Sequence, residues 1–554
     1  MKHIDSYIKM MVFGILLLTG CSKDLDLTPR DTISDASFWK TANDYRLAAN
    51  NLYLSLEGFG SDTESDIAFN MPNSVSNGTY QPSETDGNWN DQYIYIRRCN
   101  NIIEKAATSP IAEEIKNYVA EALFFRAYNY WRLYRLFGGA PLVTKVLDID
   151  SEELYGPRAS RKDVVDFILK DLTEAASGLP ESKSLSDADR GRITKGAATA
   201  LKARVALFEG TWAKFRNDAG ANAYLDMAIE SASAVMNSGQ YELYKGMGEE
   251  SYRHLFIEAG DDCSEAILDR RYQIDISHHD YSFGIQQTGY LPTKKLADMY
   301  LCSDGLPVTQ SSLFQGYNTR TSEFQNRDPR MTMTFMTPGL MAYQPIHSGR
   351  VENWPFYPQR NSNTGYIIYK YMSEDSVSML TRKQDFDNHI IRYAEILLVY
   401  AEAVFEKNGS ISDADLDKSV NLIRQRVNMP GLTNEFVAAN GLNMQQELRR
   451  ERTVELALEG FRWDDLRRWK TAETELKEDI KGIKIAGSEW TEPVIIEGSD
   501  RNPYADPAWQ SKTDADGFII AETGRTFDPN RHYLRPLPTK EIAINPSLEQ
   551  NPGW

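Results

Sequence analysis

The sequence predicts a mainly α-helical protein dominated by paired amphipathic helices, which two irregular, loop-rich regions interrupt. Several long segments repeat apolar residues at spacings of three and four, which places those residues on one face of a helix. Short breaks containing Gly and Pro separate these segments, as at the ends of helices. With 41% hydrophobic residues, the chain of 554 residues can bury a substantial core.

The helical segments occur in both halves of the chain. The clearest apolar stripe runs from Val119 to Phe137 and stops at Gly138-Gly139, whereas Gly210 is expected to end a second stripe that begins at Ala198. From these patterns we predict helices over residues 38–56, 92–106, 119–137, 198–208, 393–404 and 454–461. Helix pairs joined by short turns suggest an array like that of tetratricopeptide repeats, in which each pair buries its apolar face against the next.

Two regions interrupt this helical rhythm. Residues 58–88 are rich in Ser, Asn, Asp and Gly, and residues 274–371 combine short apolar runs with turn residues and many aromatics. A loop of about thirty residues in a compact protein is usually functional or disordered. We therefore expect ligand contacts in the irregular regions, chiefly in the second.

The N-terminus has the pattern of an export signal. Lys2 and Lys9 precede a short run of uncharged, mostly apolar residues from Met10 to Leu18. A membrane-spanning helix needs about 20 apolar residues, so this run is too short to stay in a membrane. We predict that residues 1–20 form a signal peptide that is removed.

The signal ends in Leu18-Thr19-Gly20-Cys21, which resembles the lipobox of bacterial lipoproteins. This resemblance makes Cys21 a lipidated first residue and the anchor of the protein to a membrane, since several acyl chains hold a protein stably. The following Ser22-Lys23-Asp24 resembles the surface-export signals of lipoproteins from Bacteroides-like bacteria. The alternative is an ordinary secretory signal that happens to contain a Cys.

Charge and cysteine content exclude some classes of protein. A formal net charge of -18 would repel phosphate backbones, so we do not expect nucleic acid as a partner. Beyond Cys21, the remaining cysteines are Cys99, Cys263 and Cys302, whose wide spacing suggests neither a disulfide framework nor a zinc site.

Many short blocks follow one another along the mature chain. They include Asp26-Leu27-Thr28-Pro29, Leu136-Phe137-Gly138-Gly139-Ala140-Pro141, Asn326-Arg327-Asp328-Pro329-Arg330, Arg392-Tyr393-Ala394-Glu395, Glu459-Gly460 and Asn551-Pro552-Gly553-Trp554. Taken together and in this order, the blocks resemble those of the SusD/RagB family of outer-membrane nutrient-binding lipoproteins. The combination is far more specific than any one block.

The resemblance implies a helical scaffold of tetratricopeptide-like pairs, with an N-terminal region over residues 21–225 and a C-terminal region over residues 265–554, packed as one globule. It also implies a cell-surface protein, anchored in the outer membrane, that passes oligosaccharide to a SusC-like TonB-dependent transporter. Some relatives instead serve peptide uptake. Some also hold a structural Ca²⁺, although no oxygen-rich loop of regular spacing marks such a site here, and we expect no cofactor.

The acidic residues near position 455 are predicted to form a buried structural network. Glu455 and Glu459 lie four residues apart, with Arg452 and Arg462 three residues from them, which are spacings that allow ion pairs along a helix. Losing one partner from a buried pair costs about 3 to 5 kcal/mol. We therefore interpret these residues as structural and not catalytic.

No motif of an enzyme is found in the sequence. It contains no His-Glu-x-x-His helix, no phosphate-binding Gly-x-x-x-x-Gly-Lys loop and no Gly-x-Ser-x-Gly elbow. His278, His279 and Asp280 could touch a metal, but a surface loop explains them better. A surface glycosidase or peptidase, or a purely structural scaffold, stays as an alternative to a binding protein.

A glycan-binding site needs aromatic faces for the C–H side of a sugar ring and polar groups for its hydroxyl rim. Three clusters in the irregular regions combine these features, and from them we predict the ligand-binding residues Asn73, Tyr80, Trp89, Asp280, Tyr281, Phe283, Trp354, Tyr357 and Arg360. The alternative for each aromatic is burial in the core, and for Trp89 the two are evenly balanced. Trp354 and Tyr357 are favoured because Pro355 and Pro358 fix an extended, irregular backbone.

Overall fold

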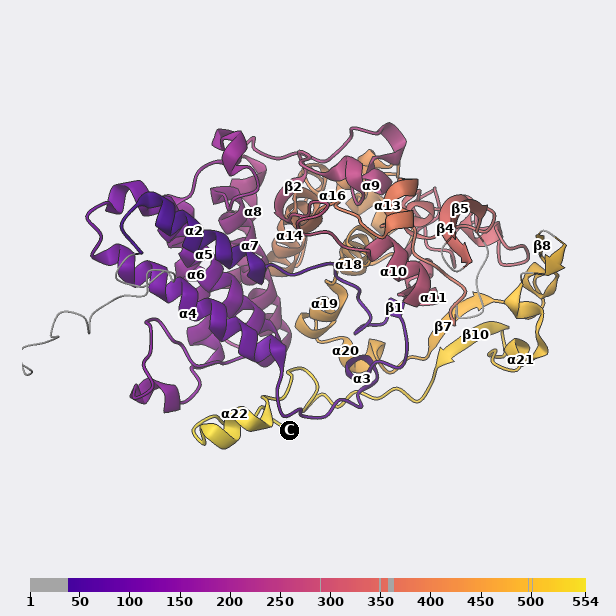
Figure 1. Ribbon diagram of the computed structural model, residues 1–554. Helices are drawn as coiled ribbons and strands as arrows, with labels where there is room; N and C mark the ends of the chain where they lie inside the picture. The colour runs from indigo at the N-terminus through magenta and orange to yellow at the C-terminus, as the bar shows by residue number, and fades with distance from the viewer. Residues whose placement is uncertain (1–37, 289, 348–349, 357–362, 497, 501) are drawn as a thin grey trace, which may run out of the picture.

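The computed structural model describes residues 38–288, 290–347, 350–356, 363–496, 498–500 and 502–554. The mainly helical fold predicted from the sequence is confirmed (Figure 1). An N-terminal bundle consists of α2 (Ala42–Leu52), α4 (Gly87–Ala107), α5 (Ala112–Phe137), α6 (Arg161–Gly178), α7 (Lys195–Arg216) and α8 (Ala221–Met236). From α4 onward each of these helices packs against the next, as expected for paired amphipathic helices.

The rest of the chain has a few longer helices and many short ones. The longer ones are α10 (Tyr281–Thr288), α14 (Tyr393–Asn408), α16 (Val420–Arg426), α18 (Met444–Glu455) and α19 (Arg462–Arg468). The short ones are α3 (Ser74–Asn77), α9 (Ser251–His254), α11 (Lys294–Met299), α12 (Arg330–Thr334), α13 (Ser376–Thr381), α15 (Asp413–Asp417), α17 (Asn434–Ala439), α20 (Ala472–Glu475), α21 (Pro507–Gln510) and α22 (Thr539–Ile544). Helix α14 packs on α8 and so joins this region to the bundle.

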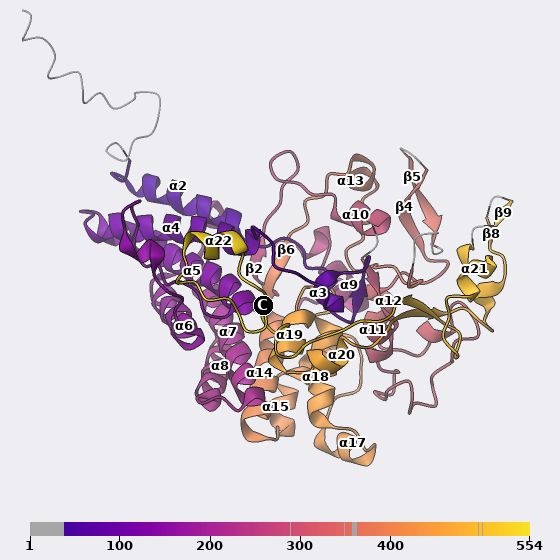
Figure 2. The same cartoon turned by 90° about the horizontal axis from the view of Figure 1, so that it is seen from below.

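The strands form small antiparallel pairs and no extended sheet within the described residues. The pairs are β1 (Ala68–Phe69) with β3 (Leu291–Pro292), β2 (Ala266–Arg270) with β6 (Asn388–Arg392), β4 (Met341–His347) with β5 (Arg350–Pro355), β7 (Ile480–Lys484) with β10 (Phe518–Glu522), and β8 (Ile495–Ile496) with β9 (Ser499–Asp500). In both views the β4–β5 hairpin lies beside α10 and α13, and the contacts agree (Figures 1 and 2).

Two hydrophobic cores support these elements. One fills the bundle and continues under α14, and the other lies within the C-terminal region, around residues such as Tyr252 and Tyr300. In the part of the chain that the structure describes, no helix combines the length and the apolar composition that crossing a membrane requires. The division into regions 21–225 and 265–554 stays a prediction.

Several predicted helix bounds differ from the structure by a few residues, and two of the differences have a clear physical reason. Gly210 does not end its helix, because α7 continues to Arg216. A Cβ atom at Gly210 would lie 2.9 Å from the side chain of Leu225 on α8, so the glycine allows two helices to approach closely. The helix predicted over 454–461 ends instead at Glu455, and Leu458 takes a left-handed φ of 66° in the turn that follows.

The acidic network predicted around Glu455 is buried, as expected. Glu455 is fully buried, and its carboxylate lies 2.6 to 2.9 Å from the guanidinium groups of Arg330, Arg392 and Arg426. Arg392 also contacts Glu459 at 2.8 Å. Each of these arginines comes from a different element, namely α12, β6 and α16.

The pairings proposed from helical spacing are not the ones that form. Arg452 binds Asp465 at 2.9 Å, and Arg462 binds Asp66 at 2.8 Å. The helix ends before Glu459, so the residues do not continue along one helical face. Partners distant in the sequence therefore replace the local ones.

Replacing Glu455 tests how much this network contributes to the stability of the fold. Glu455→Gln should lower the free energy of unfolding by about 3 to 5 kcal/mol at neutral pH, because three buried guanidinium groups lose a shared negative charge. Denaturant titration measures the loss. The control Glu113→Gln, in a highly exposed pair with Lys116, should cost less than about 0.5 kcal/mol, and an equally small loss for Glu455→Gln would contradict the assignment.

The same variant predicts a pH dependence. Burial alone would raise the pKa of Glu455, but the charges of Arg426, Arg392 and Arg330 hold it well below its usual range. A carboxyl with a lowered pKa in the fold contributes fully above its unfolded pKa of about 4.3, and its contribution is lost as the pH falls below that value. The stabilities of wild type and Glu455→Gln should therefore converge in acid.

Candidate functional site

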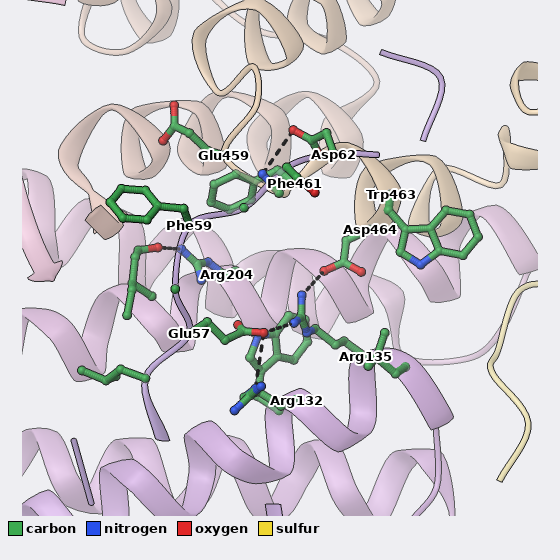
Figure 3. A pocket seen from close by; sticks show the side chains of 18 of the residues that line it. Glu57, Phe59, Asp62, Arg132, Arg135, Arg204, Glu459, Phe461, Trp463 and Asp464 are labelled. Carbon is green, nitrogen blue, oxygen red and sulfur yellow. Dashed lines mark hydrogen bonds and ion pairs between the residues drawn. The ribbon is translucent and has the colours of Figure 1, made fainter. Parts of the chain in front are cut away.

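A cavity of about 600 Å³, here called the junction cavity, lies between the N-terminal bundle and the C-terminal region. Its walls come from α5 and α7 on one side and from residues 459–468 on the other, and the segment 54–64 runs along it (Figure 3). The labelled lining residues are Glu57, Phe59, Asp62, Arg132, Arg135, Arg204, Glu459, Phe461, Trp463 and Asp464. Charged side chains dominate this lining.

The charges in the junction cavity pair with one another. Glu57 forms an ion pair with Arg135, and its carboxylate lies 3.3 Å from the guanidinium of Arg132. Arg135 continues to Asp464 at 3.3 Å, which links the bundle to α19. Burial would raise the pKa of Glu57, but Arg135 and Arg132 lower it below its ordinary value. These groups are used to join the two regions, and a ligand would have to compete with them.

Asp62 fixes the segment 54–64 to the start of α19. Its carboxylate accepts the backbone N–H of Arg462 at 2.8 Å and that of Gly460 at 3.1 Å. Asp62 itself has a left-handed φ of 52°, a conformation that Asp tolerates better than most residues. Because the polar groups that line the cavity already pair with one another, we interpret the cavity as a structural junction and propose the ligand site elsewhere.

The aromatic cluster at the edge of this cavity centres on Phe59. The Phe59 ring stacks on Tyr281 of α10, with centroids 4.2 Å apart, and lies nearly parallel to Tyr272 at 5.9 Å. The Tyr281 hydroxyl donates to the carbonyl of Gly60 at 2.9 Å. Phe59 thus joins the first irregular region of the sequence to the second. Sequence reasoning missed it, although its place between Gly58 and Gly60 in a predicted functional loop was an available signal.

The first predicted cluster is not assembled into one surface. Trp89 is only 3% exposed and packs edge-on against Phe137 in the bundle core, so core packing accounts for it and it offers no face to a sugar. The Asn73 side chain caps α3 by accepting from the N–H groups of its first turn. The half-buried Tyr80 ring lies edge-on to Trp554, 5.9 Å away.

The second predicted cluster lies on and before α10. Asp280 is exposed, whereas Tyr281 and Phe283 are half-buried. Tyr281 is held by Phe59, and the guanidinium of Arg382 lies 3.8 Å from the centroid of the Phe283 ring. This cluster therefore combines aromatic rings held by neighbouring side chains with charged groups at the surface, and its role in ligand binding stays a prediction.

The third predicted cluster lies partly outside the described residues. Tyr357 and Arg360 fall there, as does the side chain of Trp354. The backbone of Trp354 belongs to β5, opposite Ala342 of β4, so the expected irregular stretch is in fact one strand of a hairpin. Both strands of this hairpin contact α13, and β4 also contacts α10, so the hairpin backbone lies beside the helix that carries the second cluster.

In the part of the chain that the structure describes, no group of three or more His, Cys, Asp or Glu side chains is arranged to hold a metal ion. Cys99 and Cys302 are buried and Cys263 is half-buried, all three as free thiols.

Asp62 yields a prediction about pH and stability. Burial raises its pKa to about 7, although the N–H groups of Arg462 and Gly460 oppose this. A carboxyl whose pKa is raised in the fold destabilises the protein as the pH rises from its unfolded value of about 3.9 towards 7. As the pH rises across that range, the free energy of unfolding of Asp62→Asn should therefore increase by about 2 to 4 kcal/mol relative to that of wild type. Denaturant titration at several pH values measures the difference. The same pH dependence in both proteins would show that Asp62 ionises normally.

Sequence profiles of known families match most of the chain. The profile of the SusD family matches residues 265–554, and a profile described as starch-binding associating with outer membrane matches residues 34–207. A SusD-like protein of Formosa agariphila is 25% identical over 523 residues, which are 86% of this chain and 93% of that protein.

Solved structures agree with these profiles. A SusD-like protein of Bacteroides fragilis aligns with a TM-score of 0.73 and 26% identity, covering 95% of this chain and all of that one. A second protein of Bacteroides fragilis, described as a SusD-like carbohydrate binding protein, aligns with a TM-score of 0.73 and 24% identity, covering 93% of this chain and all of that one. Proteins of this family bind ligands and are not catalytic. With its C-terminal half matched by the family profile and its fold shared almost end to end, the chain belongs to the SusD family.

Proposed function

We propose that this protein binds an oligosaccharide at the cell surface and delivers it to a SusC-like TonB-dependent transporter in the outer membrane. Cys21 would anchor it by its lipid. The site would lie on the surface formed by α10, the β4–β5 hairpin and Arg382, which directly follows α13. We call it the α10 surface. It includes Asp280, Tyr281 and Phe283, together with Trp354, Tyr357 and Arg360.

One observation carries this proposal: half-buried aromatic rings on α10 lie beside exposed polar groups and are held in place by the fold. Phe59 stacks on Tyr281, and Arg382 covers one face of Phe283. Sugars bind to such rings through their C–H faces while their hydroxyls reach the polar groups. Rings that are already fixed lose little conformational entropy on binding, which favours affinity.

The family supports this class of ligand. One structural relative is described as carbohydrate binding, and one family profile is described as starch-binding. Peptide uptake is the second candidate, because stacking and amide contacts suit peptides as well. A surface glycoside hydrolase is disfavoured by membership of a family of binding proteins.

A panel of oligosaccharides tests the proposal directly. Isothermal titration of the purified protein should show binding to at least one glycan, and chromatography should show no product. Trp354→Ala should then weaken binding by about tenfold or more while leaving the melting temperature almost unchanged, since an exposed substitution costs within about 0.5 kcal/mol.

Three results would count against this account. Steady product formation would favour a hydrolase, and binding of peptides alone would favour the second candidate. A large fall in the melting temperature of Trp354→Ala would assign Trp354 to the core, where loss of a Trp costs about 3 to 5 kcal/mol. Trp89→Ala serves as a control. It should lower the melting temperature as the loss of a core Trp does, with no selective effect on the affinity for one ligand, because Trp89 is buried in the bundle.

The lipid anchor is tested at Cys21. Cys21→Ala should leave a protein that is soluble or retains its signal peptide, because the residue that would carry the lipid is gone. Membrane fractionation and the mass of the mature N-terminus measure the outcome. Cys263→Ala serves as the matched control and should fractionate like wild type, and normal outer-membrane retention of Cys21→Ala would overturn the anchor.

A further inference from the structure

Arg382 has a backbone conformation that its side chain does not favour. It follows the last residue of α13 with φ 57° and ψ 34°, in the left-handed region. For residues other than Gly this region costs roughly 1 to 2 kcal/mol, and Gly is the usual residue at such a helix end. Non-glycine residues in this conformation can mark functional positions, so the role of the side chain needs an explanation.

The Arg382 side chain is also unusual in its contacts. It is exposed, and its guanidinium lies 3.8 Å from the ring centroid of Phe283, which comes from a different helix. Among the residues that the structure describes, Arg382 has no carboxylate within ion-pair distance and its side chain donates no hydrogen bond. The neighbouring cation Lys383 is, by contrast, paired with Asp275 at 2.5 Å.

That Arg382 has no carboxylate partner among the described residues is notable in so acidic a chain. The sequence contains 79 acidic and 61 basic residues, so carboxylates are plentiful. The arginines of the buried network are each matched by carboxylates, as Arg392 is by Glu455 and Glu459. Arg382 therefore keeps its charge and its donors available at the surface.

Three apolar side chains in the two segments that meet near Arg382 are exposed. On α13, Val377 is 63% and Leu380 58% exposed, and Ile276, in the loop before α10, is 77% exposed. The loop is joined to the end of α13 by the backbone pairing of His279 with Gln384. Scattered exposed apolar residues are common, but several around one cation suit the C–H faces of a sugar that also carries a charge.

We infer that Arg382, held by Phe283, forms a subsite for an oxyanion substituent, carboxylate or sulfate, on the bound glycan. This inference rests on the proposed glycan-binding function and names its substrate class as acidic oligosaccharides. The guanidinium lies over the ring and donates no hydrogen bond within the described residues, so its N–H groups are available for a bidentate contact with two oxygens. The stacking also restrains a flexible side chain before the ligand arrives, which lowers the entropic cost of binding.

The test uses Arg382→Gly, which removes the charge and relieves the backbone. Titration calorimetry would use an oligogalacturonate, a sulfated galactan oligosaccharide and a neutral galactan oligosaccharide of the same length. We expect the variant to lose about tenfold to a hundredfold in affinity for whichever acidic glycan the wild type binds, with an unchanged or higher melting temperature. The carboxylate and sulfate arms identify the group that is recognised.

Three further variants separate charge from backbone strain. Arg382→Gln keeps the left-handed residue but removes the charge, and it should lose affinity as Arg382→Gly does. Lys470→Gly relieves the same conformation, φ 59°, at an exposed helix end elsewhere and should leave affinity unchanged. Arg98→Gln removes another exposed arginine that lies over an aromatic ring, Tyr95 at 4.9 Å, and should also be neutral.

The outcomes distinguish this inference from the proposed function. Binding of the neutral glycan alone, or unchanged affinity for an acidic glycan in both Arg382 variants, would overturn the subsite and leave the glycan-binding function standing. Absence of binding to any glycan would overturn both. Equal losses in Arg98→Gln and Arg382→Gln would show a general charge effect, and that result would also overturn the subsite.

Discussion

The position of the α10 surface depends on the buried ion pair between Arg392 and Glu455. Arg392 ends β6, and its guanidinium is matched by Glu265, Glu455 and Glu459, each within 2.8 Å. A buried guanidinium with these partners cannot move without leaving a charge unpaired, at a cost of several kcal/mol. The end of β6 is thus fixed to the chain before β2, to α18 and to the turn after it.

That fixed strand determines where α10 lies. Strand β6 pairs with β2, and the chain leaves β2 directly into the segment that carries Tyr272 and leads to α10. On the other side, Glu459 begins the turn whose Gly460 N–H is bound by Asp62, and Asp62 ends the segment that carries Phe59. The stack of Phe59 on Tyr281 therefore joins two segments that are both anchored to the same buried charges. The aromatic rings are therefore held in place through the segments that the buried ion pairs fix.

The sequence was sufficient where local spacing determines structure and insufficient where distant residues meet. The stripe ending at Phe137 predicted α5 correctly, because a helical face is a property of a short segment. The role of Gly210 was wrong because it depends on Leu225, which belongs to another helix. The buried network was expected, but its partners were not, since Arg330 and Arg426 approach Glu455 from elsewhere in the chain. Phe59 and Arg382 were missed for the same reason. Each contacts an aromatic ring of α10, Tyr281 or Phe283, that is distant from it in the sequence.

The same chain uses arginine in two opposite ways, and the difference follows from burial. A buried guanidinium must be matched by carboxylates, because the desolvation of an unpaired charge is prohibitive, and such an arginine is thereby unavailable to a ligand. An exposed guanidinium carries no such penalty, and a ring beneath it restrains the side chain without consuming its N–H donors. Burying Arg392 gives the fold its fixed centre, whereas leaving Arg382 exposed over Phe283 gives the surface a free, oriented cation. The buried Arg392 therefore stabilises the fold, whereas the exposed Arg382 carries the recognition that we infer, and the strand pair β2–β6 together with α10 connects the two residues.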